Sequence, residues 1–256
     1  TGTQSTVGTR WKRIGDIRTG DQIIDRTGNV STVIGVHPQG RKRIYKMTFS
    51  DGRETHSGAE HLWTVFDKER GANDGLEVDY TTAMLIDKLK DKHYHKRPIR
   101  MPLATPEEQP SKTHVIPPYI QGVMLTGTRL NGKLYYTKLP EDVIAEIQTQ
   151  LPAFFTFTQV KPHTWVIAHA EGKPFDEKPR TLPLDYLEDS IDNKLSLIQG
   201  VMDCRGKVDN NHIYCPIPDP VYSYALQYLF RSLGGTAAVD KKYLKVTLPH
   251  ELNYFK

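Results

Sequence analysis

The first part of the chain consists of short apolar runs separated by turn signals, spaced too closely to leave room for helices between them. The runs cover residues 22–25, 30–36 and 43–49, and Pro38-Gln39-Gly40 and Ser50-Asp51-Gly52 favour tight turns after the second and third runs. Strands that follow one another this closely indicate a compact all-β module, which we expect over residues 1–80.

The next stretch, residues 81–115, changes in character and predicts a connection between two modules. Thr81 or Thr82 can cap a helix of about ten residues that starts at this point. A basic segment follows, and every fourth residue from Pro98 to Pro110 is proline. Because proline cannot continue a helix, we expect a linker here that contains the domain boundary.

From residue 116 onwards the apolar spacing alternates between the helical and the extended period. Helices are predicted at 117–126, 142–150, 192–203 and 220–233, the last with Gly234-Gly235 as its C-cap. Strands are predicted at 133–136, 154–159, 164–168, 211–216, 237–240 and 244–248. The order of elements in residues 116–180 returns in residues 181–256, which predicts an α+β domain of two pseudo-symmetric α/β repeats.

The strongest evidence for the repeat is a shared pentapeptide. Ile-Gln-Gly-Val-Met occupies residues 120–124 and again residues 198–202, and in each copy its Ile, Val and Met form an apolar stripe on a helix. A glycine inside a helix is roughly 1 kcal/mol less favourable than alanine. We therefore expect Gly122 and Gly200 to face each other where two helices cross closely, and the C-terminal ends of these helices to lie together.

Composition and charge narrow the class of protein. The chain has 256 residues and a net charge of +4, which is compatible with binding nucleic acid. The sequence contains no run of eighteen apolar residues, so no membrane span is predicted, and the first residues lack a signal-peptide pattern. Cys204 and Cys215 are the only cysteines, too few for a cysteine-rich zinc cluster, and are expected to be buried reduced thiols of an intracellular protein.

The repeated helices carry a resemblance to a known family. Residues 120–128 and 198–206 resemble the LAGLIDADG motif of homing endonucleases, which has a metal-binding catalytic acid at its eighth position. In this sequence the eighth positions are Gly127 and Arg205, whereas Asp203 stands at the sixth position. The resemblance therefore implies a DNA-cleavage centre that has lost its metal ligands, with no metal and no cofactor; Mg²⁺ is expected only if nuclease activity survives.

The N-terminal module resembles the Hint fold of inteins, most closely those inserted in phage proteins. The matching stretches are residues 11–23, 33–40, 49–53 and 59–63, and the last contains His61, which corresponds to the block B histidine that assists the N-terminal acyl shift. The competing hypothesis for His61 is a packed histidine on a strand. Thr1 in place of a Cys or Ser nucleophile, Gly58 in place of a threonine, and the lack of a terminal His-Asn predict that this chain does not splice on its own.

Together the two resemblances imply an all-β Hint-like module followed by a LAGLIDADG domain over residues 116–256. The family grips double-stranded DNA with the strands that follow each motif helix, and the corresponding basic residues are Arg129, Lys133, Lys138, Arg205, Lys207, Lys241, Lys242 and Lys245. The alternative for these residues is a solvated basic face.

Three functions remain open at this point. The first is an intein-derived element, inactive in splicing and cleavage, kept as a structural insert or DNA-binding remnant in a phage-type host protein. It would reside in the cytoplasm of a bacterial host or within a phage particle. The second is part of a split or truncated intein that splices with a separate C-terminal piece. The third is an active endonuclease that uses displaced acids such as Asp203 or Asp209.

Overall fold

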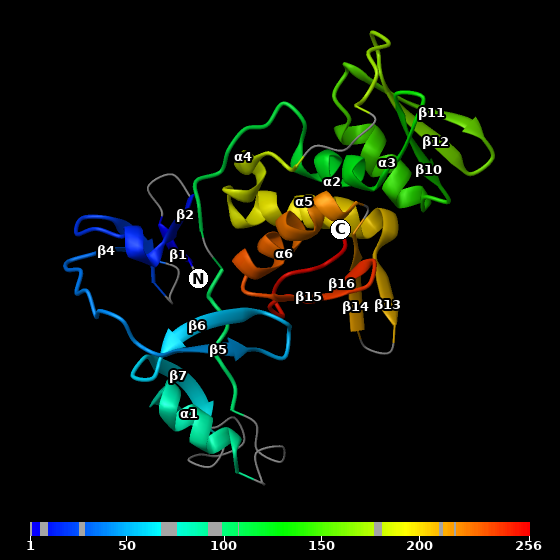
Figure 1. Cartoon of the computed structure of the whole chain (residues 1–256). Coiled ribbons are helices and arrows are strands. Elements are labelled where there is room, and N and C mark those ends of the chain that lie inside the picture. Colours follow the sequence, from blue (N-terminus) through cyan, green and yellow to red (C-terminus); the bar gives the residue numbers. More distant parts are fainter. Residues whose placement is uncertain are drawn as a thin grey trace. The chain divides into compact units, whose positions relative to one another are not determined.

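In a computed structural model of the protein, the chain divides into two compact units, Thr1–Ala104 (unit 1) and Thr105–Lys256 (unit 2) (Figure 1). The structure describes residues 2–5, 10–25, 29–67, 76–91, 99–106, 108–176, 181–209, 212–217 and 219–256. Thr1, Pro98 and Asn211, which figure in the sequence-based predictions, lie outside the described residues. Within the described ranges, no helix is both long and apolar enough to cross a membrane.

Unit 1 is built from small antiparallel sheets. One sheet has the strand order β2-β1-β3-β4, and two hairpin-like pairs, β5-β6 and β7-β8, follow it. The strands are β1 (Gly2–Ser5), β2 (Arg10–Arg13), β3 (Gln22–Ile24), β4 (Val30–Thr32), β5 (Ile44–Thr48), β6 (Glu54–Gly58), β7 (Leu62–Asp67) and β8 (Leu76–Thr81). A 3-10 turn, η1 (Ile14–Asp16), and one helix, α1 (Thr82–Leu89), complete the described part of this unit.

The predicted strand 30–36 is shorter in the structure. It ends at Thr32 because its partner β3 begins only at Gln22, after a turn at Gly20 that has a φ of 94°. Beyond that point Val33 exchanges backbone hydrogen bonds of 2.8 Å with the turn itself, through Gly20 and Asp21. The tight turn therefore ends the ladder before the apolar run does.

Helix α1 belongs to unit 1. Its N-cap is Thr81, whose side chain accepts a hydrogen bond from the amide of Met84 at 3.2 Å. The helix buries Leu85 against Val65 and Tyr80 in the small core of this unit. The segment 81–115, predicted as a linker, thus begins with a helix packed in unit 1, and from Thr105 onwards it is part of unit 2.

Residues after Thr105 are held firmly within unit 2. His114 forms a hydrogen bond with the buried carboxylate of Asp189, which also accepts one from the amide of Lys112 at 2.9 Å. The ring of His114 stacks on that of Tyr186 at 4.1 Å between centroids. Burial alone would raise the pKa of Asp189, but these hydrogen bonds and those from Asn193 and Ser190 hold it below its ordinary value. This cluster fixes the chain where it enters the first motif helix.

Unit 2 contains two copies of one topology. The first copy consists of α2 (Pro118–Thr126), β9 (Thr128–Leu130), β10 (Lys133–Thr137), α3 (Glu141–Gln150), β11 (Phe155–Lys161) and β12 (Thr164–His169). After α4 (Leu184–Leu187) the second copy consists of α5 (Ile191–Arg205), β13 (Lys207–Asp209), β14 (His212–Pro216), the turn η4 (Pro220–Tyr222), α6 (Ser223–Ser232), β15 (Thr236–Asp240) and β16 (Tyr243–Thr247). The sheets run β11-β12-β10-β9 and β15-β16-β14-β13, so each strand has its counterpart at the same place in the other sheet.

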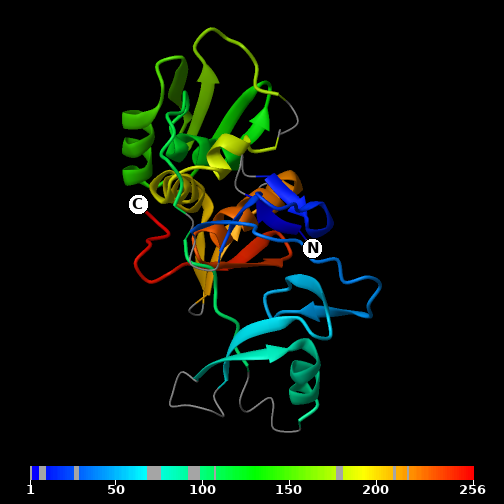
Figure 2. The ribbon, with the colours of Figure 1, turned by 90° about the vertical axis from the view of Figure 1, so that its left-hand side faces the viewer.

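The fold of unit 2 is therefore a mixed α+β arrangement of two four-stranded antiparallel sheets packed with helices. Helices α2 and α5 lie between the two sheets, as both views show (Figure 2). Each sheet turns one face towards the helices: Leu134 and Ile167 are buried in the first sheet, and Leu244 and Val246 in the second. The opposite face of each sheet, called here the open face, is left for other contacts.

Candidate nucleic-acid interface

The two motif helices touch through their glycines. A β-carbon added to Gly122 would lie 2.1 Å from the carbonyl oxygen of Leu197, and one added to Gly200 would lie 2.1 Å from the carbonyl oxygen of Tyr119. Leu197 is 78 residues from Tyr119, as Gly200 is from Gly122, so the contacts are reciprocal. Because no β-carbon fits at either place, glycine is required at the crossing of α2 and α5.

The C-terminal ends of α2 and α5 meet beyond this crossing. Arg205, the last residue of α5, donates a hydrogen bond from Nη2 to Oγ1 of Thr128, two residues after α2, at 3.3 Å. The two positions at which the motif would carry acids are thus at adjoining helix ends, but one is an arginine and the other is Gly127. Neither offers a carboxylate oxygen to a metal ion.

Gly127 also has no space for a larger residue. A β-carbon added there would lie 2.7 Å from Oη of Tyr136 and 2.9 Å from Cβ of Leu134. Both neighbours are buried, and Tyr136 donates a hydrogen bond to the carbonyl of Val123 at 3.3 Å. The first acid position is therefore closed by the packing of the first repeat.

Asp203, two residues before Arg205 in α5, has a different environment. It is half-buried and accepts hydrogen bonds from Oη of Tyr119 at 2.9 Å and from the amide of Lys256 at 3.3 Å. Burial raises the pKa of Asp203, against the opposing effect of these hydrogen bonds. Residues two positions apart in an α-helix are about 200° apart around its axis, so Asp203 and Arg205 lie on nearly opposite sides of α5.

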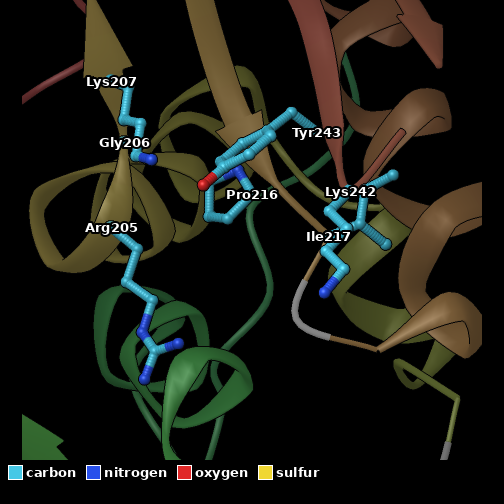
Figure 3. Close-up of a pocket in the computed structure, with 7 residues that line it drawn as sticks. All are labelled: Arg205, Gly206, Lys207, Pro216, Ile217, Lys242 and Tyr243. Carbon is cyan, nitrogen blue, oxygen red and sulfur yellow. The ribbon is translucent and has the colours of Figure 1, made fainter. Parts of the chain in front are cut away.

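A basic cavity lies next to the end of α5 (Figure 3). Its volume is about 410 Å³, and it is lined by Arg205, Gly206, Lys207, Pro216, Ile217, Lys242 and Tyr243. Three of these residues are cationic and none is acidic. The ammonium of Lys207 lies 4.7 Å from the centre of the Tyr243 ring, a cation–π distance. The cavity is suited to an anionic group.

The open face of the second sheet continues this basic surface. Lys207 pairs with Tyr214 across β13 and β14, and Tyr214 pairs with Lys245 across β14 and β16, so the three side chains form one row. The ring of Tyr214 lies 6.3 Å from that of Tyr243 and 6.5 Å from that of His212. The alternation of Tyr214 with the buried Cys215 along β14 is the sequence signal that could have identified these aromatic residues in advance.

The other predicted DNA-binding residues are scattered. Lys133 begins β10 in the first sheet, and Lys138 lies in the turn after that strand with a φ of 57°. Lys241 lies in the turn between β15 and β16, beside Lys242. The structure brings together Arg205, Lys207 and Lys242 in the cavity and Lys245 in the adjoining row, and does not bring the first-repeat lysines to them.

Arg129 does not lie on the open face of its sheet. It pairs with the buried Leu134, so its side chain lies on the side of the sheet that faces the helices. Its guanidinium donates hydrogen bonds to the carbonyl of Asp176 at 3.3 Å and to Oη of Tyr222 at 3.5 Å. Because β9 has only three residues, apolar alternation could not show which of its side chains face the helices.

His61 is also placed differently from one prediction. It lies in the loop before β7 rather than on a strand, and its side chain is exposed rather than packed in the core. Its ring contacts that of Trp63, with 4.6 Å between centroids, and its carbonyl accepts the amide of Thr82 at 3.0 Å. The hypothesis of a packed strand histidine is therefore wrong, because the chain has left the ladder of β6 before it reaches this residue.

The two cysteines are free thiols. Cys215 is buried in the core of the second repeat, and burial raises the pKa of the Cys204 thiol to about 12. Among the described residues, no three His, Cys, Asp or Glu side chains lie close enough together to hold a metal ion. No protein-family model matches the chain, and no curated protein matches its sequence.

Proposed function

We propose that unit 2 is a DNA-binding module of the LAGLIDADG type that no longer cleaves DNA. Three features support this: the topology occurs in two copies, the motif helices cross at Gly122 and Gly200, and the strands after α5 present a basic and aromatic open face. Such a face suits the phosphate backbone of a duplex, because lysine and arginine contacts to phosphates supply affinity without reading sequence.

The main support for a loss of DNA cleavage is the pair of residues at the two helix ends. Where the two helix ends meet, the positions that need metal-binding acids hold Arg205 and the sterically closed Gly127. Metal-assisted phosphodiester cleavage depends on carboxylates that fix the ions between the attacking and leaving oxygens. An arginine at that point repels such ions. With unit 1 as a Hint-like module, the chain is then an intein-derived element retained as a structural insert or DNA-binding remnant of a phage-type protein.

The proposal predicts salt-dependent binding of duplex DNA through the second sheet. The test measures fluorescence anisotropy of a labelled random-sequence duplex over a series of salt concentrations. Replacing both Lys207 and Lys245 with Ala should lower the slope of log Kd against log salt by about 1.8, since each phosphate contact contributes about 0.9. The matched control is the double variant Lys90→Ala and Lys173→Ala, which changes the charge equally at exposed residues that are paired with neighbouring acids.

Two outcomes of this titration would contradict the proposal. In one, the parent protein fails to bind the duplex even at low salt. In the other, the Lys207 and Lys245 variant keeps the slope of its control, which would mean that the open face of the second sheet does not meet phosphates.

Protein splicing by unit 1 is the second candidate, and one observation favours it. The exposed side chain of His61 is accessible to a peptide segment, as a block B histidine requires. The test is to mix the chain with C-terminal intein fragments that end in His-Asn and to search by mass spectrometry for a ligated product. A product that disappears in His61→Ala would establish this function. Cleavage by displaced acids is not favoured for Asp203, which is occupied by Tyr119.

A further inference from the structure

We infer that the cavity beside α5 is a binding site for a single phosphodiester group in which Arg205 replaces the divalent metal ion as the fixed positive charge. This inference deepens the proposed function and rests on it for the identity of the ligand, a duplex DNA backbone. It adds that the grip on DNA at the joined helix ends is independent of any metal.

The donors around the cavity are suited to an anion. Arg205 uses one N–H of its guanidinium for Thr128 and has four more, and a guanidinium matches two oxygens of a phosphate at once. Lys207 and Lys242 add two ammonium groups to the same lining. No ion pair joins any of the three to a carboxylate among the described residues. The volume of about 410 Å³ lies within the range of small-ligand sites.

The electrostatics also favour an anion despite the position at a helix end. The C-terminus of a helix carries roughly half a negative charge, which by itself would repel a phosphate. Arg205, in the last turn of α5, lies directly at this end and offsets it. With Lys207 and Lys242 included, three full positive charges outweigh the helix dipole, so the cavity remains cationic without a bound metal.

The location ties the cavity to the cleavage position of the resemblance. Arg205 stands at the eighth motif position and reaches across to Thr128, just after the motif helix of the other repeat. A metal ion held there by two acids would neutralise a backbone phosphate lying across the helix ends. The guanidinium supplies the same sign of charge at the same place, but it has no ligand sites for water and cannot generate a nucleophile. Binding is retained and cleavage is not.

The first arm of the test measures duplex binding by fluorescence anisotropy in EDTA and in MgCl₂ at matched ionic strength. The parent protein should have the same Kd in both. Arg205→Ala should weaken binding about tenfold and lower the salt slope by about 1, whereas Arg205→Lys should keep most of the slope because the charge remains. Lys173→Ala, with the same change of charge at an exposed residue away from the cavity, is the control.

The second arm needs no DNA and uses inorganic phosphate as the probe. Phosphate should raise the Tm of the parent and of Lys173→Ala more than chloride of equal ionic strength does. Arg205→Ala should show a clearly smaller difference, which is the general stabilisation that phosphate gives to folded proteins. Lys173→Ala controls for the loss of one positive charge.

The outcomes separate the two claims. If the parent does not bind the duplex but phosphate raises its Tm through Arg205, the anion site stands and the DNA-binding proposal falls. If the duplex binds but Arg205→Ala matches Lys173→Ala in both arms, the inference falls and the DNA-binding proposal stands. A parent that binds the duplex only with Mg²⁺ present would also overturn the inference.

Discussion

Gly122 and Gly200 are equivalent residues in contact with each other's helices. Each presents its bare Cα to a backbone carbonyl of the other helix, at a place where an added β-carbon would lie 2.1 Å from the oxygen. Gly122 meets Leu197, and Gly200 meets Tyr119. Leu197 and Tyr119 occupy equivalent positions in the two repeats. The pseudo-symmetry of unit 2 is therefore expressed in its closest packing contact.

This contact predicts that replacing a helical glycine with alanine lowers the stability of the protein, the opposite of the usual effect. Inside a helix, alanine is ordinarily favoured over glycine by about 1 kcal/mol. At Gly200, however, the methyl group would collide with backbone, which cannot move aside alone. Gly200→Ala should therefore destabilise the protein, and Gly200→Leu should do so by about 1–3 kcal/mol or more. Thermal denaturation of both variants measures the effect.

The control for this pair is Gln148, an exposed residue of α3. Gln148→Ala and Gln148→Leu should change the stability by less than about 0.5 kcal/mol. If Gly200→Leu melts at the temperature of the parent, then α2 and α5 do not cross at this residue and the repeat loses its structural basis.

Placing an acid at each of the two helix ends should fail for a steric reason. Asp at position 127 would place its β-carbon against Tyr136 and Leu134, and would displace Tyr136 from its hydrogen bond to Val123. We expect Gly127→Asp to be destabilised by about 1–3 kcal/mol or more, as for other overpacked sites. Arg205→Asp, at an exposed residue, should lose only about 1 kcal/mol, because it replaces a favourable charge in the last turn of α5 with an unfavourable one.

Urea denaturation of the two single variants and the double variant measures this difference. The double variant should remain inactive on duplex DNA with Mg²⁺ or Mn²⁺. A double variant that is as stable as Arg205→Asp, or that cleaves, would show that the first acid position is open after all.

Asp203 should make stability depend on pH. Burial raises the pKa of this carboxyl in the folded state, so the unfolded chain releases its proton first as the pH rises. The folded state is then progressively disfavoured, starting near the ordinary Asp pKa of about 3.9 and continuing up to the raised folded pKa. Asp203→Asn keeps an oxygen for Tyr119 and removes this loss. Its Tm relative to the parent should therefore increase from acidic to neutral pH.

The measurement is the difference in Tm between Asp203→Asn and the parent at several values of pH. Asp209→Asn, at the exposed end of β13, serves as the control and should show little change. A difference for Asp203→Asn that stays flat between pH 3.5 and pH 7, which brackets the ordinary pKa, would mean that the pKa of the carboxyl is not raised.

The features that could be predicted from the sequence are those with local signals. Thr81 caps α1 because a threonine oxygen can reach the amide three residues later. Gly234 terminates α6 because glycine readily adopts a φ of 77°. The amide of Gly235 then donates a hydrogen bond of 2.9 Å to the carbonyl of Phe230, which closes a Schellman motif. The motif glycines were found because they recur in two copies of one pentapeptide.

What could not be predicted depends on partners far away in the sequence or on very short strands. His114 and Asp189 are 75 residues apart, and neither has a neighbour in the chain that indicates the pair. Strands β9 and β13 have three residues each, so apolar alternation cannot show which face of the sheet their side chains occupy, and the position of Arg129 on the helix-facing side could not be predicted. The closed space at Gly127 depends on Tyr136, which reaches it only through the sheet.

The central claim is that this protein holds duplex DNA and does not cut it. The most direct measurement selects bound duplexes from a random library in EDTA, then incubates the selected duplexes with the protein and Mg²⁺ or Mn²⁺, and resolves the products on a gel. We predict that duplexes are recovered and that they remain intact over the full incubation. Recovery of none, or a site-specific double-strand break in those recovered, would contradict the account.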